Sequence, residues 1–279
     1  MDFKTLKETP PWEWPSDAGK TFLRVLRNHR ADEGDRLLAA EMMGDSTVID
    51  DELAEALLEV LQGGKEPAEL RGQAAISLGP ALEEAHMYGF EDPDDVPISE
   101  EVAEKIQETL RKIHRDTKED KEVRRRSLEA SVRAPQEWHR DAVLSAYNSK
   151  DDDWKLTAVF CMGYIRGFEK QILESLGKGN LETQREAISA AGNWELSSAW
   201  PHIRSLLRSK ETEKSLLLAA IEAAPGIRPD EAMEALEEFL KSDDEEIVDA
   251  AQEAMSMAGA MIDYEDEEEE DDGGSKTYH

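Results

Sequence analysis

The sequence predicts an all-α protein, and more specifically an α-solenoid in which pairs of short helices stack in a row. Composition is the first indication, because Ala, Leu, Glu, Lys and Arg recur while Val and Ile are sparse, which favours helix over strand. The second is a spacing pattern: small or aliphatic residues recur three, four, seven and eight positions after a leading residue. The aromatic content of only 6% also suits closely packed helices.

The recurring pattern predicts the first helix of each pair, because its offsets describe one face of a helix. Copies begin at Arg36, Arg71, Arg124, Lys155, Gln184, Leu216 and Ile247. Most successive copies are separated by about 31 residues, and one insertion near 84–98 lengthens a single interval. A unit of that length holds two short helices and two turns, and it can bury its apolar stripe only against its neighbours. We therefore expect about six to seven helical pairs within residues 17–262.

The second helix of each pair is expected between successive copies of the pattern. Leu53, Leu57 and Leu61 illustrate the three- and four-residue apolar spacing that predicts these helices. Glycine and proline between the segments supply the turns. The expected second helices cover residues 51–62, 99–114, 136–148, 170–177, 200–208 and 229–241.

One copy reads as a complete family signature. The string from Arg71 to Gly79 is Arg-Gly-Gln-Ala-Ala-Ile-Ser-Leu-Gly. It resembles the HEAT repeat superfamily, in particular the short form named after phycobilisome lyase subunits, whose signature is Arg-x-x-Ala-Ala-x-x-Leu-Gly. The resemblance covers roughly residues 32–260, although several copies lack the leading Arg or the closing Gly. It implies a right-handed superhelix whose second helices line an inner face, and it does not imply a lyase, because fold alone does not fix function.

Three segments lie outside the repeats. Residues 1–16 form a Pro/Trp-rich extension, whose tryptophans we expect to cap the open end of the stack. The insertion at 84–98 is either a binding loop or a surface excursion whose aromatic side chains fold back. Residues 263–279 contain nine acidic residues between Asp263 and Asp272, which predicts a disordered tail. The tail either keeps the chain soluble or contacts a basic partner or the basic stretch at 101–133.

The net charge limits the classes of partner, and the cysteine content indicates the compartment. The net charge of −31 opposes attraction to phosphate backbones and anionic lipids, so we expect neither nucleic acid nor a membrane as a partner. The single cysteine, Cys161, excludes an intrachain disulfide and favours a reducing compartment. No charged-then-apolar leader and no apolar run long enough to cross a membrane are found, so a cytoplasmic location is expected.

No recognisable motif for catalysis, a cofactor or a metal is present, and we expect a non-enzymatic protein. Histidines are not paired with other ligands at the spacing of a metal site; they are His29, His86, His114, His139, His202 and His279. Iron-dependent hydroxylases that share the HEAT-like repeat use His-Glu pairs, and this sequence has no His-Glu dipeptide. Cys161 lies in an apolar helical face, where core packing is the simpler interpretation.

Two surfaces are candidates for binding. Aromatic, histidine and arginine residues on second helices would line the inner face and favour a protein or peptide partner, although core packing explains the tryptophans equally well; they are Trp138, Arg140, Tyr147, Trp200, His202, Arg204 and Arg208. Between 101 and 133, ten cations stand among eight acids, which favours an anionic ligand. Salt bridges between residues four apart, with Glu108, Glu119, Glu122 and Glu129, are the alternative and account for much of the same charge. The cations of that candidate patch are Arg111, Lys112, Arg115, Lys118, Lys121, Arg124, Arg125 and Arg126.

Three functions remain open on the sequence. The leading hypothesis is a non-enzymatic scaffold or adaptor that binds a protein or peptide on the inner face, with a preformed surface that loses little entropy on binding. The family name suggests a lyase-like chaperone or enzyme that handles a prosthetic group. The acidity suggests a chaperone or decoy for basic proteins, whose binding would depend strongly on salt.

Overall fold

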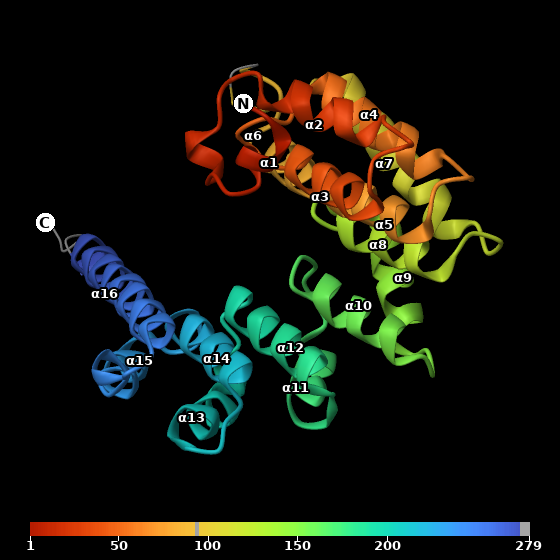
Figure 1. Ribbon diagram of the computed structural model, residues 1–279. Helices are drawn as coiled ribbons and strands as arrows, with labels where there is room; N and C mark the ends of the chain where they lie inside the picture. Colours follow the sequence, from red (N-terminus) through yellow and green to blue (C-terminus); the bar gives the residue numbers. More distant parts are fainter. Residues whose placement is uncertain (93–94, 274–279) are drawn as a thin grey trace, which may run out of the picture. The chain divides into compact units, whose positions relative to one another are not determined.

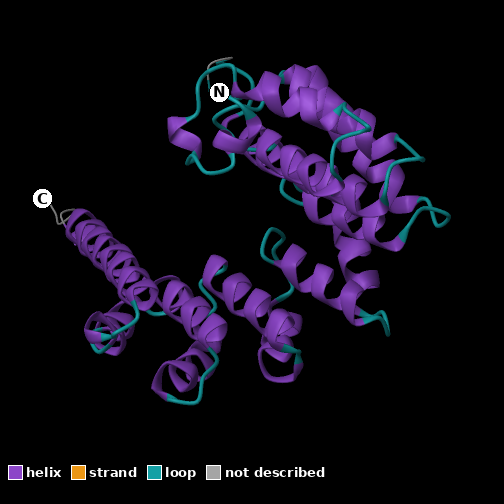
Figure 2. Cartoon of the chain, in the orientation of Figure 1, coloured by secondary structure: helices purple, strands orange, loops and turns teal. Residues whose placement is uncertain are grey.

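A computed structural model describes the backbone of residues 1–92 and 95–273, and the side chains as far as Ile262 (Figures 1 and 2). Within these residues the secondary structure is helical and no strand occurs, which confirms the predicted all-α class. The chain divides into two compact units, Met1–Ala142 and Val143–His279. The division falls within α9 (Glu137–Tyr147), and each unit is described by itself.

The predicted first helices form a row in each unit. In unit 1 these are α3 (Glu33–Met43), α5 (Ala68–Ser77) and α8 (Lys121–Ser131), and α5 packs against both of the others. In unit 2 each first helix packs against the next one in the chain: α10 (Asp152–Met162), α12 (Leu181–Asn193), α14 (Lys214–Ile227) and α16 (Glu245–Gly273). Each of the seven contains one leading residue of the sequence pattern, so the pattern marks this layer of both units.

The second helices pack beside the first. Unit 1 contains α2 (Ala18–Leu26), α4 (Asp51–Gln62) and α7 (Glu100–Arg115), and unit 2 contains α11 (Glu169–Lys178), α13 (Trp200–Arg208) and α15 (Pro229–Leu236). Each contacts the first helix that follows it in the chain. The ends of α4, α7, α9, α11 and α13 lie within one residue of the sequence prediction. α15 is shorter than predicted, and a 3-10 turn at Phe239–Lys241 takes the rest of its segment. Each unit is therefore a row of stacked helix pairs, as predicted for an α-solenoid.

Acidic residues begin many of these helices, because a side-chain oxygen can accept hydrogen bonds from the free N–H groups of the first turn. Asp32, Asp50, Asp120 and Asp151 accept such bonds at the starts of α3, α4, α8 and α10. Small side chains such as Ala39 are fully buried where helices meet. The fold thus follows from local capping combined with close helix contacts.

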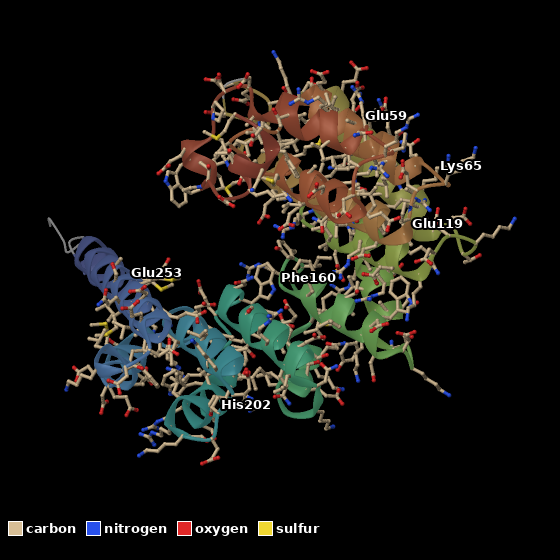
Figure 3. All side chains as sticks on the ribbon, in the orientation of Figure 1. Glu59, Lys65, Glu119, Phe160, His202 and Glu253 are labelled. Atoms are coloured by element: carbon tan, nitrogen blue, oxygen red, sulfur yellow. The ribbon has the colours of Figure 1, made fainter. Side chains whose placement is uncertain are left out.

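The leading arginines connect three elements each. Nε of Arg36 donates to the Leu26 carbonyl at 2.9 Å, and its two terminal nitrogens bind Glu66 at 2.8 and 2.9 Å. Arg71 repeats the arrangement, with Nε donating to the Leu61 carbonyl at 2.8 Å and bonds of 2.8 and 2.6 Å to Glu119, whose position is labelled in Figure 3. The signature arginine therefore joins the end of one second helix to the start of the next repeat.

A further helix occupies part of the predicted insertion. α6 (Gly79–Tyr88) follows α5 after a single residue and packs against α5, α7 and α8. Gly79-Pro80 resembles a turn in the sequence. Proline nevertheless fits the first turn of a helix, because a backbone N–H at that position makes no hydrogen bond within the helix and its absence costs nothing. Of the insertion's aromatic residues, Tyr88 is exposed and Phe90 packs against the core.

The N-terminal extension covers part of α2. After α1 (Phe3–Leu6) and a 3-10 turn at Pro11–Glu13, Trp14 meets Phe22 edge-on at 5.0 Å, and its indole N–H donates to the Thr9 carbonyl at 2.8 Å. Trp12, by contrast, is 79% exposed. One of the two tryptophans therefore covers the helical core of unit 1.

At the other end of the chain, α16 continues to Gly273, so helical backbone extends into the segment for which the sequence predicts disorder. Residues 274–279 lie outside the described part of the chain, and the disordered tail stays a prediction.

Candidate partner-binding surface

Arginine and tryptophan side chains meet where α7 ends and α9 begins, in unit 1. Arg111 and Arg115 lie one helical turn apart on α7, so they share a face of that helix. Their guanidinium carbons lie 6.0 and 5.6 Å from the ring centre of Trp138, in the first turn of α9. The His114 ring lies 5.5 Å from the same ring. We call these four residues the arginine–tryptophan cluster.

A chain of hydrogen bonds fixes the position of the Trp138 side chain. Its indole N–H donates to the Gln136 side-chain oxygen at 2.7 Å, and the Gln136 side-chain amide donates to Gln107 of α7 at 2.5 Å. The Gln136 backbone N–H donates to Nδ1 of His139 at 2.8 Å. His139 is 1% exposed, and its Nε2 lies 3.0 Å from Oγ of Ser131. The indole is thereby fixed before any partner arrives.

The two histidines beside the tryptophan are neutral at physiological pH. Burial lowers the pKa of His139 to about 4. Because Nδ1 of this ring accepts a hydrogen bond, the remaining proton is on Nε2, which donates to Ser131. Burial also lowers the pKa of His114; the hydrogen bond between its Nδ1 and the Arg124 carbonyl opposes this shift, while the charges of Arg124 and Arg115 add to it. The positive charge of the cluster therefore comes from Arg111 and Arg115.

The candidate cationic patch divides into two groups in the structure. Arg124, Arg125 and Arg126 serve the fold: Arg124 donates to the His114 carbonyl at 3.0 Å, while the other two contact Glu122 and Glu129 within α8. The remaining cations are exposed, and they are Arg111, Lys112, Arg115, Lys118 and Lys121. Among the described residues, no carboxylate lies within ion-pair distance of Arg111 or Arg115.

The predicted partner-binding residues are divided between the two units. Trp138 and the exposed Arg140 belong to unit 1, whereas the others belong to unit 2. Trp200 is buried at the start of α13, and the exposed Arg204 and Arg208 follow it on the same helix. Nε2 of the half-buried His202 (Figure 3) is a buried atom that has no hydrogen-bond partner among the described residues.

Tyr147 donates its hydroxyl to the Gln171 carbonyl at 3.4 Å and lies 5.3 Å from the Lys155 ammonium. Its hydroxyl therefore connects α9 to α11 within unit 2.

A second arginine–tryptophan contact was not predicted from the sequence. Arg166 lies 4.6 Å from the ring centre of Trp194, whose indole N–H donates to the Met162 carbonyl at 2.7 Å. The two residues are far apart in the sequence and share no local pattern, so only the packing of α10 beside α12 reveals the contact.

Within the described side chains, no group of three or more histidine, cysteine or acidic residues is placed to hold a metal ion. Across the part of the chain that the structure describes, no helix combines the length and the apolar character needed to span a membrane.

Comparisons with known proteins give likeness in structure only. No family model and no curated protein sequence matches this chain. Human deoxyhypusine hydroxylase is 16% identical over 92% of this chain and 88% of its own, with a TM-score of 0.42. A mutant of Kap121p is 13% identical over 88% of this chain but only 27% of its own, with a TM-score of 0.47. A designed armadillo repeat protein is 15% identical over 85% and 98%, with a TM-score of 0.31. At these scores the likenesses carry no argument about function.

Proposed function

We propose that this chain is a non-enzymatic helical-repeat scaffold that binds an acidic segment of a partner protein at the arginine–tryptophan cluster. The observation that carries the proposal is the pair Arg111 and Arg115, which lie over Trp138 without an ion pair among the described residues. In a chain of net charge −31, two adjacent cations without a carboxylate partner mark a place where an acidic ligand is attracted.

The chemistry of the cluster fits a peptide ligand. Guanidinium groups bind carboxylates with two parallel hydrogen bonds, and they can do so while their flat faces lie on an aromatic ring. Tryptophan and arginine are also enriched among residues that dominate interface energies. Because Gln136 and His139 fix Trp138, binding loses little side-chain entropy.

The test is direct binding of a labelled peptide to the full chain. The probe is a synthetic dodecapeptide with four Glu and two Asp around a central Leu-Tyr pair, followed by fluorescence anisotropy at moderate salt. Replacing both arginines, as Arg111→Glu with Arg115→Glu, should weaken binding at least tenfold. Trp138→Ala should weaken it severalfold, because the arginines then lose the surface that orients them.

The matched control reverses two exposed lysines of unit 2, Lys170→Glu with Lys210→Glu, which changes the net charge by the same amount. If the control weakens binding as much as the cluster variant does, the peptide responds to overall charge, and the proposal that it binds at the arginine–tryptophan cluster is wrong. If neither variant changes the affinity, the proposal is wrong.

A further inference from the structure

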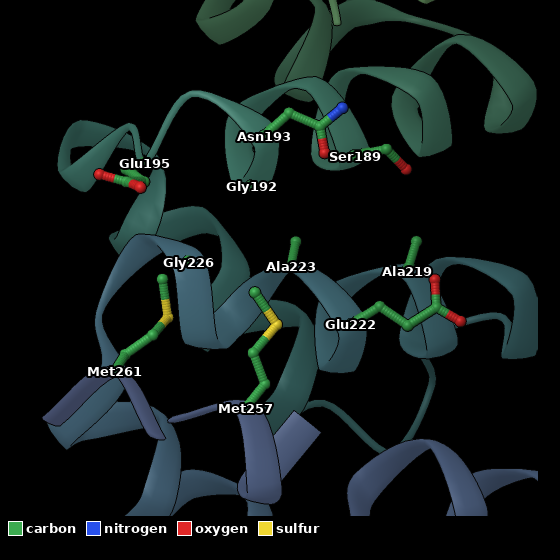
Figure 4. A pocket seen from close by; sticks show the side chains of 10 residues that line it. All are labelled: Ser189, Gly192, Asn193, Glu195, Ala219, Glu222, Ala223, Gly226, Met257 and Met261. Atoms are coloured by element: carbon green, nitrogen blue, oxygen red, sulfur yellow. The ribbon is translucent and has the colours of Figure 1, made fainter. Parts of the chain in front are cut away.

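A pocket with a volume of about 270 Å³ lies between α12, α14 and α16 of unit 2 (Figure 4). Small residues, including Gly192 and Ala223, form one part of its lining, and Met257 and Met261 of α16 form another. Met257 is 48% exposed. Asn193 also lines the pocket. We call this pocket the acidic groove, because Glu195 and Glu222 are among its lining residues.

Two carboxylates, Glu195 and Glu222, line the groove and lie at opposite ends of it in Figure 4. Glu195 has a φ of 52°, a backbone conformation that a side chain other than glycine rarely adopts. Strain of this kind concentrates at functional sites. Burial raises the pKa of Glu222, and the charge of Glu253 raises it further, although Arg185 opposes that effect. Among the described residues, neither Glu195 nor Glu222 forms an ion pair, so both carboxylates can accept a cation from a ligand.

A repeat of unit 1 has a cavity at the position that corresponds to the acidic groove of unit 2. Gly192 stands eight residues after the leading Gln184, and a Cβ on it would lie 3.0 Å from the Ala223 Cβ. Gly44 stands eight residues after Arg36, and a Cβ on it would lie 2.4 Å from the Ser77 carbonyl oxygen. Both glycines allow close contact between the C-terminal end of one first helix and the next first helix, and a cavity opens beside each contact.

The cavity of unit 1 is also acidic, and a segment of the chain itself borders it. This cavity, of about 760 Å³, is lined by Glu41 and Asp45, and by Lys7, Pro11 and Trp14 of the N-terminal extension. A cationic and an aromatic residue thus border the same cavity as carboxylates in unit 1, where Lys7 itself forms its ion pair with Asp35. In unit 2 the lining residues come only from α12, α14, α16 and the turn after α12.

We propose that the acidic groove of unit 2 binds a short segment of a partner protein in which Lys or Arg stands next to an aromatic side chain. The two carboxylates attract the cation, and the two methionines, which are flexible and polarizable, contact the ring. Pockets for small organic ligands range over roughly 300–1,000 Å³, and this smaller one suits one or two side chains of a peptide. The groove lies in unit 2 and is independent of the arginine–tryptophan cluster.

The experiment measures binding of a labelled octapeptide, Gly-Lys-Trp-Lys-Pro-Leu-Lys-Gly, to the full chain by fluorescence anisotropy. Met257→Lys changes an exposed side chain, so the fold should persist, and it should weaken binding at least fivefold. Glu222→Lys should weaken it at least tenfold. A peptide with Ala in place of Trp should bind at least fivefold more weakly to the unchanged protein.

The control is Glu182→Lys, an exposed charge reversal in the first turn of α12, seven residues before Ser189, the first lining residue of that helix. It should leave the affinity within twofold. Equal losses from Glu182→Lys and Glu222→Lys would show attraction to overall charge and overturn the proposal. It is also overturned if the peptide fails to bind the unchanged chain, or if Met257→Lys, with an unchanged circular dichroism melt, binds normally.

Discussion

The buried arginines of the repeat signature should contribute more to stability than exposed ion pairs do. The side chains of Arg36 and Glu66 are 7% and 14% exposed, whereas those of Arg27 and Glu59 are 51% and 69% exposed. Removing one partner of a buried pair leaves a charge without compensation, which costs about 3 kcal/mol. Arg36→Ala should therefore lower the free energy of unfolding of unit 1 by about that amount in urea denaturation, while Arg27→Ala should lower it by under about 1 kcal/mol. Equal effects would contradict this assignment.

His139 should make unit 1 less stable in mild acid. Its pKa of about 4 lies below the ordinary value for histidine, so the unfolded chain takes up the proton first as the pH falls. Stability is unaffected above the ordinary value of about 6.5 and is lost as the pH falls towards 4, by about 2 kcal/mol at pH 5. His139→Gln should remove this part of the pH dependence in urea denaturation at pH 8 and pH 5. A matched change at the exposed His86, His86→Gln, should preserve it; if His139→Gln preserves it too, the buried ring is not its source.

For individual residues, the sequence identified important side chains, but it did not identify the residues that they contact. The leading Arg71 was evident from the signature, but its carboxylate partner Glu119 is 48 positions away. Trp138 and Arg115 were assigned to two different candidate surfaces, and the structure joins them. In each case the partner is chosen by how two helices pack, which local spacing does not specify.

Close contact between α3 and α5 depends on Gly44, at the C-terminal end of α3. A Cβ on Gly44 would lie 2.4 Å from a backbone oxygen of α5, whereas a Cβ on Gly64, in the turn before α5, would meet nothing within 4 Å. Gly44→Ala should force α3 and α5 apart and destabilise unit 1 by about 1 to 3 kcal/mol. Gly64→Ala should change the stability by no more than about 0.5 kcal/mol. Thermal melts of both variants measure the difference. A neutral Gly44→Ala would show that the helices adjust without loss.

At the element scale, helix boundaries were predictable because each helix carries its own apolar spacing and its own start and stop residues. α4 and α13 begin and end where the sequence placed them. α6 was missed because Gly79-Pro80 resembles a turn, and because it continues almost directly from the signature of α5. The acidic groove was missed for a different reason, since its lining is assembled from three helices whose contacts depend on tertiary packing.

The molecule as a whole combines strong acidity with local sites of opposite sign. Net charge decides solubility and long-range attraction, while each site depends on charges that its own neighbours leave uncompensated. Arg111 and Arg115 form such a place in unit 1, and Glu195 and Glu222 form one in unit 2. An adaptor with one basic and one acidic site could bind two partners of different character, and the two peptide assays separate these activities.

The net charge of −31 should also make thermal stability rise with salt. Carboxylates repel one another in the folded chain, and the screening length falls from roughly 30 Å at 0.01 M salt to roughly 10 Å at 0.1 M. Added salt weakens the exposed ion pairs too, but these contribute little individually. We therefore expect Tm to rise by about 3 °C or more between the two concentrations. A chain that ends at Ile262 lacks nine of the carboxylates and one lysine, so its Tm should rise less. A fall in Tm with salt would show that the ion pairs outweigh the repulsion between carboxylates.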